Sequence, residues 1–217
     1  MSAAIVVAVD GPAASGKTTL ARRLAEANGL RFLDTGLLYR AVARRVLARG
    51  QSPADEPAAA AAAETVREDD LDPRALSAER IGEGASVVAV HPAVRRALLA
   101  FQHDFAVRPP GAVLAGRDIG SVVCPDATLK LFITATPEVR ARRRFEELRS
   151  RGEVVMYERV LQDVVERDRR DQDRAVAPLT AAPDAIRIDT SALELDASLA
   201  ALQAALDTRL SIPRRKT

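Results

Sequence analysis

The sequence predicts an α/β protein in which five parallel strands form one sheet with helices on both faces. Short apolar runs alternate with longer segments whose apolar residues recur at helical spacing, and this alternation is typical of βαβ units. The first run, residues 4–9, is apolar throughout, as expected for a strand that helices cover on both sides. The 217 residues can form one such domain with insertions or two small domains, and we expect one.

The expected strands are short apolar runs separated by helical segments. They are residues 4–9, 31–34, 112–115, 129–134 and 185–189. Parallel sheets bind ligands beyond the carboxyl ends of their strands. Polar residues that lie at or after these ends should therefore gather at one edge of the sheet. They are the loop after the first strand, Asp34 and Thr35, the string 116–118, and Thr134.

The loop after the first strand has the spacing of a phosphate-binding loop, G-x-x-x-x-G-K-[ST]. Its residues are Gly11, Pro12, Ala13, Ala14, Ser15, Gly16, Lys17 and Thr18, with Thr19 next. The two glycines let the backbone curl so that several N–H groups face one anion. Lys17 can reach the β- and γ-phosphates of a nucleoside triphosphate, and the Thr18 hydroxyl can ligate a Mg²⁺ ion held between them.

The flanks of this loop support the same interpretation. Residues 19–27 have helical spacing, and Gly29 stands where a helix would stop. The positive end of that helix would face the anion. The alternative, a glycine-rich turn that carries a lysine by chance, does not explain why a strand precedes the loop and a helix follows it. The loop therefore predicts ATP binding with Mg²⁺.

Two charged strings are candidates for a second ligand. The string 116–120, Gly-Arg-Asp-Ile-Gly, follows a strand, so Arg117 and Asp118 would face the ligand crevice, although a turn with a surface ion pair fits it equally. Arg167, Asp171 and Arg174 share one helix face if the helix continues to Arg174. Two guanidinium groups beside a carboxylate suit a phosphate and sugar hydroxyls, whereas a solvated helix face would show the same spacing.

A helix after Thr136, its expected N-cap, carries four arginines. They are Arg140, Arg142, Arg143 and Arg144. Like charges repel, so the cluster needs neutralising groups: a lid that closes over ATP would supply an anion, and Glu146 and Glu147 are the alternative. Gly152 interrupts the helical pattern, and we interpret it as a hinge. A second helix is expected over about residues 156–173.

Other chemistry-bearing residues give no site signal. His91 and His103 have no partner at a metal-binding spacing, so we expect surface or packing roles. Cys124 is the only cysteine, which excludes an internal disulfide and fits a reducing compartment. The alanine run 58–63 is most simply a helix surface without functional meaning.

Composition argues against several classes of function. The 32 basic and 30 acidic residues are dispersed, whereas a nucleic-acid binder is expected to gather its charge in a patch. Tryptophan is absent and aromatics are 3%, which argues against base-stacking platforms. No apolar run reaches the roughly 18 residues of a membrane span, and the N-terminus lacks the pattern of a signal peptide. We expect a cytoplasmic monomer that binds small molecules, without a nucleic-acid or membrane partner.

Together these segments resemble the bacterial cytidylate kinase family over about residues 4–191. The matching stretches are 9–19, 33–36, 39–42, 85–86, 92–95, 116–120, 125–127, 142–145 and 167–179. Many kinases share the phosphate loop, so the strings 116–120 and 167–179 are what point to this family.

The resemblance implies a P-loop, three-layer sandwich that transfers the γ-phosphoryl group of ATP to CMP or dCMP, giving ADP and CDP or dCDP, with Mg²⁺ as cofactor. It implies an insert for the nucleoside monophosphate at about residues 36–110 and a helical lid at about residues 142–171. The core would comprise about residues 1–35, 111–141 and 172–210. Bacterial members usually have a longer insert with a small sheet, and residues 71–84 match it poorly.

The resemblance also assigns roles to residues of the acceptor site. The residues that would read the cytosine edge are Ser86, Arg95 and Asp118. Those that would hold the acceptor phosphate are Arg40, Arg117 and Arg174. The sugar would contact Arg167 and Asp171, with Thr35 near the acceptor. The expected catalytic residues are Lys17, Arg117, Asp118 and Arg174.

This assignment agrees with the chemistry of phosphoryl transfer. The attacking group is already a phosphate oxygen, so positioning and charge neutralisation matter more than a strong base. Two rivals stay open: a P-loop kinase for UMP, AMP or a small alcohol, and a catalytically silent nucleotide-binding regulator. The arginines favour a phosphorylated acceptor over an alcohol, and intact Lys17 and Thr18 argue against the regulator.

Overall fold

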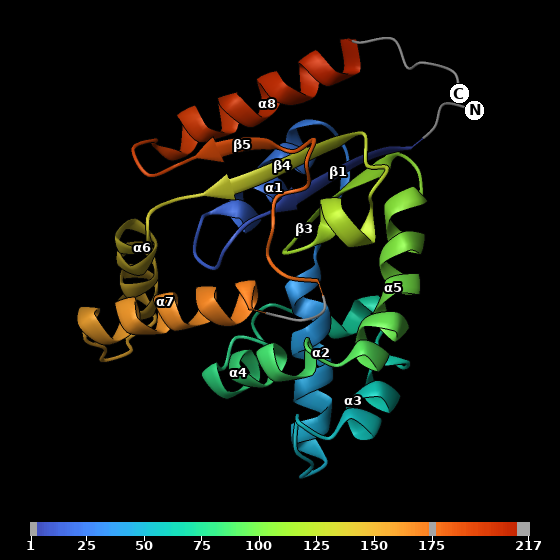
Figure 1. The fold of residues 1–217 in the computed structure, drawn as a ribbon, viewed down its shortest axis with the longest axis vertical. Coiled ribbons are helices and arrows are strands. Elements are labelled where there is room, and N and C mark those ends of the chain that lie inside the picture. The colour runs from blue at the N-terminus through green and yellow to red at the C-terminus, as the bar shows by residue number, and fades with distance from the viewer. Residues whose placement is uncertain (1–3, 174–176, 212–217) are drawn as a thin grey trace.

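In the computed structural model, which describes residues 4–173 and 177–211, five parallel strands form one sheet between layers of helices (Figure 1). The strands are β1 (Ile5–Asp10), β2 (Arg31–Asp34), β3 (Gly111–Gly116), β4 (Leu129–Thr134) and β5 (Ile186–Asp189). Their order across the sheet is β2-β3-β1-β4-β5. The predicted fold class is confirmed, and each strand end lies within one residue of its expected position.

The parallel register brings the carboxyl ends of the strands to one edge. β1 is central and pairs with β3 through Asp10↔Gly116 and with β4 through Asp10↔Phe132. At the next positions outward, Asp34 of β2 lies opposite Ala115 of β3, and Thr134 of β4 lies opposite Asp189 of β5. The polar residues expected at this edge therefore lie along the same edge, as the topology requires.

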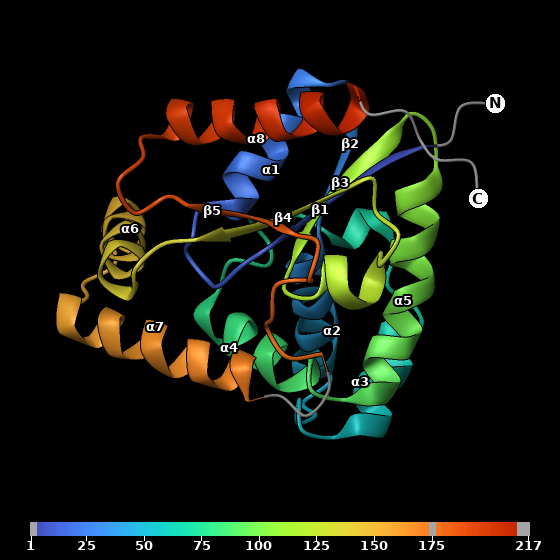
Figure 2. The ribbon, with the colours of Figure 1, turned by 45° about the horizontal axis from the view of Figure 1, so that its top comes forward.

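One face of the sheet is covered by α1 (Lys17–Ala27) and α8 (Leu195–Ser211), as Figure 2 shows. Their leucines form a dry layer with the apolar residues of β1, β3 and β4. The fully buried leucines of this layer include Leu24, Leu202 and Leu206. Aliphatic side chains dominate, because the chain holds only 3% aromatic residues.

The other face is covered by α2 (Thr35–Ala48) and α5 (Pro92–Val107), while α3 (Glu56–Ala63) packs outside them and α4 (Glu79–Val88) packs against α2. The expectation that the alanine run 58–63 is a helix surface is wrong: Ala59, Ala62 and Ala63 are buried in the core. Their methyl side chains let α3 pack closely against α2 and α5. Residues 35–110, all of them described, hold these helices and a 3₁₀ turn, η1 (Glu68–Asp70), and no strand.

Two further helices, α6 (Pro137–Ser150) and α7 (Tyr157–Gln172), pack against each other beside the sheet. They share a small core of their own, centred on Ala141, Val160 and Val164. The predicted N-cap is confirmed, since the Thr136 hydroxyl accepts a hydrogen bond from Val139 N at 3.4 Å. Gly152, at φ +82°, lies between the two helices, where the sequence predicts an interruption.

None of the helices in the described ranges combines the length and apolar character needed to cross a bilayer.

Candidate functional site

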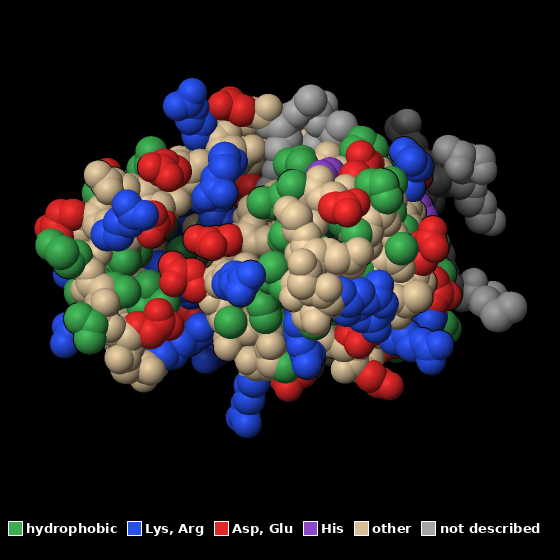
Figure 3. Space-filling model, turned by 90° about the horizontal axis from the view of Figure 1, so that it is seen from below, with side chains coloured by type: hydrophobic (Ala, Val, Ile, Leu, Met, Phe, Trp, Pro, Cys, Tyr) green, Lys and Arg blue, Asp and Glu red, His purple; other side chains and the backbone are tan. Residues whose placement is uncertain are grey.

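A cleft of about 1510 Å³ lies at the carboxyl edge of the sheet. Its walls come from the phosphate loop, the start of α2, the helix α4, and the pair α6 and α7. Seen from below, the surface is hollowed between the side formed by α6 and α7 and the rest of the molecule (Figure 3). Basic and acidic side chains are interspersed on this face rather than gathered into a patch of one sign.

The phosphate loop has the backbone that its glycines predict. Gly11 lies at φ +149°, and a Cβ there would stand 2.0 Å from the carbonyl oxygen of Ile133. Gly16, at φ +85°, directly precedes the first residue of α1. Only glycine combines this backbone with so close an approach to a neighbouring strand. The loop therefore curls at the N-terminus of α1, where a helix favours anions.

Lys17 is buried at the base of this loop, and its ammonium donates a hydrogen bond to the carbonyl oxygen of Pro12 at 3.1 Å. Burial lowers its pKa well below the ordinary value, and the positive charge of Arg117 lowers it further. An anion beside the ammonium would offset both effects. The position therefore suits a cation that contacts the phosphates of a ligand.

Thr18 and Asp34 place two oxygen ligands beside the loop. The Thr18 hydroxyl donates to Asp34 Oδ2 at 3.3 Å, while Asp34 Oδ1 caps α2 by accepting from Gly36 N at 3.0 Å. Among the described residues, no cluster of three His, Cys, Asp or Glu side chains could hold a metal. A hydroxyl and one carboxylate instead fit Mg²⁺, which is commonly completed by substrate phosphates and water.

The predicted base-reading residues line the same cleft. Arg95 forms an ion pair with the buried carboxylate of Asp118, and its guanidinium lies 5.8 Å from the centre of the Tyr39 ring. Ser86 on α4 also lines the cleft, and its hydroxyl donates to the carbonyl oxygen of Gly82 at 3.4 Å. Of the two interpretations of the string 116–120, the one that places Arg117 and Asp118 in the ligand crevice agrees with the structure, and Asp118 pairs there with a residue of α5.

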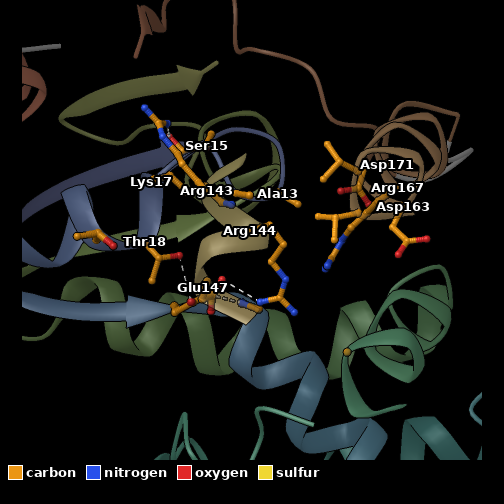
Figure 4. Close-up of a pocket in the computed structure, with 18 of the residues that line it drawn as sticks. Ala13, Ser15, Lys17, Thr18, Arg143, Arg144, Glu147, Asp163, Arg167 and Asp171 are labelled. Carbon is orange, nitrogen blue, oxygen red and sulfur yellow. Dashed lines mark hydrogen bonds and ion pairs between the residues drawn. The ribbon is translucent and has the colours of Figure 1, made fainter. Parts of the chain in front are cut away.

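The predicted phosphate and sugar residues meet where α7 faces the segment that follows β3. Arg117 Nε contacts the buried carboxylate of Asp171 at 2.7 Å. Arg167, one turn earlier on α7, has a buried Nε without a hydrogen-bond partner among the described residues. Burial and the nearby Arg117 charge lower the pKa of Arg167 to about 10. Figure 4 shows Arg167 and Asp171 across the cavity from the phosphate-loop side chains.

Arg40 and Thr35 complete the set from α2. The Arg40 guanidinium donates to the carbonyl oxygen of Leu76 at 2.7 Å and lines the cleft. The buried Thr35 hydroxyl donates to the carbonyl oxygen of Ala115 at 2.9 Å. Arg174 lies outside the described residues, and α7 ends at Gln172.

The arginine cluster of α6 is neutralised in several ways. Arg144 pairs with Glu147 at 2.9 Å, as the carboxylate alternative predicts (Figure 4). Arg140 pairs with Asp168 of α7 instead. Arg143 donates to the carbonyl oxygen of Thr190 at 2.8 Å and to that of Ser15 at 3.4 Å. Arg140, through the carbonyl oxygen of Ala13, and Arg143, through that of Ser15, therefore support the phosphate loop, a role that their spacing does not suggest.

Three carboxylates that hold the site together have no assigned role in the sequence analysis, although Asp34 is expected at the ligand edge of the sheet: Asp34, Asp10 and Asp168. Each carboxylate has its partners on another element or at a helix start. Asp10 and Asp34 carry a usable signal, since each is an acidic residue at the carboxyl end of an apolar run. Asp168 carries none, because it stands in a string of alternating charges.

The histidines and the cysteine lie where packing explains them. His91 Nε2 is 2.9 Å from the carbonyl oxygen of Pro53, and His103 Nε2 is 2.6 Å from that of Val123. Burial raises the pKa of the Cys124 thiol to about 11, which makes it a poor nucleophile.

Proteins similar to this chain over most of its length include cytidylate kinases of several bacteria. The cytidylate kinase family model matches residues 7–206. The cytidylate kinase of Xanthobacter autotrophicus is 58% identical over 205 residues, which are 94% of this chain and 98% of that protein. The cytidylate kinase of a Methylobacterium species is 60% identical over 181 residues, which are 83% of this chain and 86% of that protein.

A solved structure with the same architecture is the shikimate kinase from Bacteroides thetaiotaomicron, with a TM-score of 0.52 and 14% sequence identity. The match covers 94% of this chain and 98% of that one. At this identity the similarity concerns the fold alone, and it agrees with the P-loop kinase architecture predicted from the sequence.

Proposed function

The chain belongs to the cytidylate kinase family, and we propose that it transfers the γ-phosphoryl group of ATP to CMP or dCMP, giving ADP and CDP or dCDP. The main support for this proposal is that the phosphate loop with Lys17 and the Arg95–Asp118 pair line the same cleft. A donor triphosphate and an acceptor base can therefore be held in one enclosure, which positional catalysis requires.

On the donor side, the curled loop and the N-terminus of α1 would bind the phosphates of ATP, and Lys17 would contact the β- and γ-phosphates. We propose that Thr18 and Asp34 hold Mg²⁺ together with phosphate oxygens, because their side chains already meet at 3.3 Å. The ion would supply neutralising charge on the phosphates when bound.

On the acceptor side, Arg95 and Asp118 have the polarity that cytosine needs. The cytosine edge presents an amino donor at N4, which a carboxylate accepts, and ring acceptors, which a guanidinium serves. Uracil presents a carbonyl oxygen at that position. This oxygen and the Asp118 carboxylate are both hydrogen-bond acceptors, so they would repel each other. Ser86, on the same wall, would add a hydroxyl contact.

Arginines would neutralise the acceptor phosphate. Arg40 and Arg117 both line the cleft, and Asp171 holds the Arg117 guanidinium in place at 2.7 Å. Arg167 and Asp171 would contact the sugar, and Arg174 would add a third phosphate contact. The reaction needs no protein nucleophile, because a phosphate oxygen of the acceptor attacks the γ-phosphorus.

The proposed division of the chain follows from this arrangement. Residues of about 36–110 would form the insert for the nucleoside monophosphate, and about 142–171 the lid, around a core of about 1–35, 111–141 and 172–210. Closure of α6 and α7 over the cleft would exclude water from the transferred phosphoryl group. We also propose that the protein is a monomer, because one chain supplies every wall of the cleft, and that it is cytoplasmic, because its single cysteine fits a reducing compartment.

The experiment that tests this function is an acceptor panel. With MgATP as donor, CMP, dCMP, UMP and AMP are compared in a coupled assay for ADP release. We expect kcat/KM for CMP or dCMP to exceed that for UMP and AMP by about 100-fold or more, because a mismatched base leaves the buried polar pair unsatisfied. Equal turnover of AMP and CMP would contradict the proposal.

A pair of lysine variants tests whether Lys17 is needed for turnover and not for folding. Lys17→Ala should abolish turnover of every acceptor, because no other described ammonium group lines the cleft. Its circular dichroism spectrum should stay that of the parent protein. The control Lys130→Met removes the ammonium that pairs with Asp184 at 2.9 Å but keeps an unbranched stem over Gly120, and it should retain activity.

A further inference from the structure

Asp10 is a buried carboxylate to which neither the phosphate loop nor the acceptor site assigns a role. It is the last residue of β1 and immediately precedes Gly11, the first residue of the phosphate loop. Its Oδ1 accepts a hydrogen bond from Ile119 N at 2.8 Å, and its Oδ2 accepts one from Gly120 N at 2.7 Å. Both oxygens therefore accept hydrogen bonds from a segment that lies 109 and 110 residues further along the sequence.

That segment is a π-helical turn, η2 (Ile119–Val123). Its backbone bonds run from Val123 N to Asp118 O at 3.1 Å and from Cys124 N to Ile119 O at 2.6 Å. Such turns leave their first N–H groups without partners inside the turn. Asp10 satisfies two of these groups from the neighbouring strand, so it acts as the cap of η2.

The residue directly before the capped turn is Asp118, which pairs with Arg95 in the cleft. The main chain at Asp118 is thus anchored on both sides: Gly116 pairs with Asp10 in the sheet, and Ile119 and Gly120 bond to the Asp10 side chain. The main chain of the same residue, Asp10, leads directly into the phosphate loop. One residue therefore links the loop at the donor end of the cleft to the turn at the acceptor end.

We propose that Asp10 is a positioning residue that holds Asp118, and through it the Arg95–Asp118 pair, at a set distance from the phosphate loop, and thereby sets the affinity for the acceptor base. The inference rests on the proposed function, since it takes Asp118 to contact the base. It adds a residue outside the cleft lining to those that determine acceptor recognition.

A direct catalytic role for Asp10 fits the geometry less well. Both of its oxygens are bound to backbone N–H groups, and the carboxylate is 4% exposed and outside the lining of the cleft. Its effect on the reaction must therefore pass through the turn that it caps.

The surroundings of Asp10 make the cap sensitive to pH. The charged and titratable groups that face it are Lys17 on α1, Asp118 before η2, Cys124 after η2, and Lys130 on β4, whose stem lies over Gly120. Burial raises the pKa of Asp10 to about 6; the N–H groups of Gly120 and Ile119 lower it, Asp118 raises it, and Lys17 lowers it. Protonation would leave one N–H group of the turn with a weaker acceptor.

The test uses Asp10→Asn in the full-length protein, because this variant keeps one acceptor and replaces the other by a donor that faces Gly120 N. We expect KM for CMP to rise about 10-fold, the effect of one lost buried hydrogen bond, while KM for ATP changes less than about twofold. Asp55→Asn is the matched control: Asp55 caps α3 by accepting from Ala58 N at 3.1 Å, away from the cleft. It should leave both constants unchanged.

Two further measurements keep the inference testable if Asp10→Asn folds poorly. In Gly120→Ala, the added Cβ would meet Lys130 side-chain atoms at 3.2 Å and Asp10 Oδ2 at 3.4 Å. This variant should shift the same turn and raise KM for CMP selectively. In the parent protein, KM for CMP should rise below about pH 6 more steeply than in Asp10→Asn; comparing the two profiles removes the titration of the substrate phosphate, which both share.

The outcomes separate this inference from the proposed function. If the parent protein does not use CMP or dCMP, the proposed function fails. If it uses CMP but Asp10→Asn raises both Michaelis constants equally, or lowers stability without changing KM for CMP, the positioning role of Asp10 is overturned.

Discussion

Arg140 on α6 and Asp168 on α7 form a two-pronged ion pair in which Nη1 lies 2.9 Å from Oδ1 and Nη2 contacts Oδ2. The Arg140 side chain is 3% exposed and that of Asp168 is 17% exposed. The same guanidinium donates to the carbonyl oxygen of Ala135 at 2.8 Å and to that of Ala13 at 3.3 Å. One side chain thus ties the phosphate loop, the end of β4 and α7 together.

Asp168→Asn should destabilise the protein, because it leaves a buried guanidinium without its counter-charge. We expect a loss of about 3–5 kcal/mol in the free energy of unfolding, measured by urea denaturation. Asp163→Asn is the control, since its exposed carboxylate lies 3.5 Å from Arg159 one turn away; it should cost less than about 0.5 kcal/mol. Equal losses in the two variants would mean that the Arg140 pair contributes no more than a surface pair.

Asp118→Asn should weaken discrimination between cytosine and uracil. An amide can donate to the uracil carbonyl and offers cytosine N4 a weaker acceptor than a carboxylate does. We expect kcat/KM for CMP to fall by about 100-fold and the ratio of CMP to UMP turnover to fall with it. The acceptor panel described above measures both quantities, and an unchanged ratio would place the base away from Asp118.

Gly11→Ala should disrupt the phosphate loop for two reasons: its φ of +149° is strained for alanine, and the added Cβ would collide with a neighbouring strand. The new Cβ would lie 2.0 Å from Ile133 O, so β4 or the loop must move. We expect loss of ATP binding, measured by calorimetry. Gly50→Ala is the control: Gly50 lies at φ +69° with nothing within 4 Å of an added Cβ, so it should cost about 1 kcal/mol and leave ATP binding intact. Similar ATP affinity in both variants would contradict the steric argument.

Asp10 should give the protein a distinct pH dependence of stability. Its pKa is raised from 3.8 to about 6, so the folded state binds the proton more tightly than the unfolded chain does. The contribution of this group to stability therefore rises as pH falls through about 6 and levels off below 3.8.

Urea denaturation of the parent protein and of Asp10→Asn checks this dependence. Relative to the variant, the parent should gain on the order of 2–3 kcal/mol between pH 7 and pH 4. Parallel stability curves over this range would mean that Asp10 titrates near its ordinary value.

Much of the fold follows from local pattern. The strands end within one residue of the positions that apolar runs predict, and the phosphate loop curls as its glycines require, because both features depend on residues adjacent in the chain. The alanine run 58–63 shows the converse, because its environment does not follow from its own sequence. Alanine is compatible with a surface or a close helix contact, and only the position of α3 against α2 and α5 decides between them.

In the candidate site, too, some features depend on residues that are adjacent in the chain and others depend on packing. Spacing within a few residues is enough to predict the βαβ order and the phosphate loop with Lys17 and Thr18. Spacing alone leaves the strings that carry Arg117, Asp118 and Asp171 open between a ligand site and surface charge. Which arginines face the cleft and which hold the scaffold depends on contacts between distant segments. Arg95 meets Asp118 across 23 residues, and Asp10 caps η2 across 109, so these pairs exist only once the sheet edge is assembled. The strength of a charge pair depends on burial, and burial is a property of the whole packed chain.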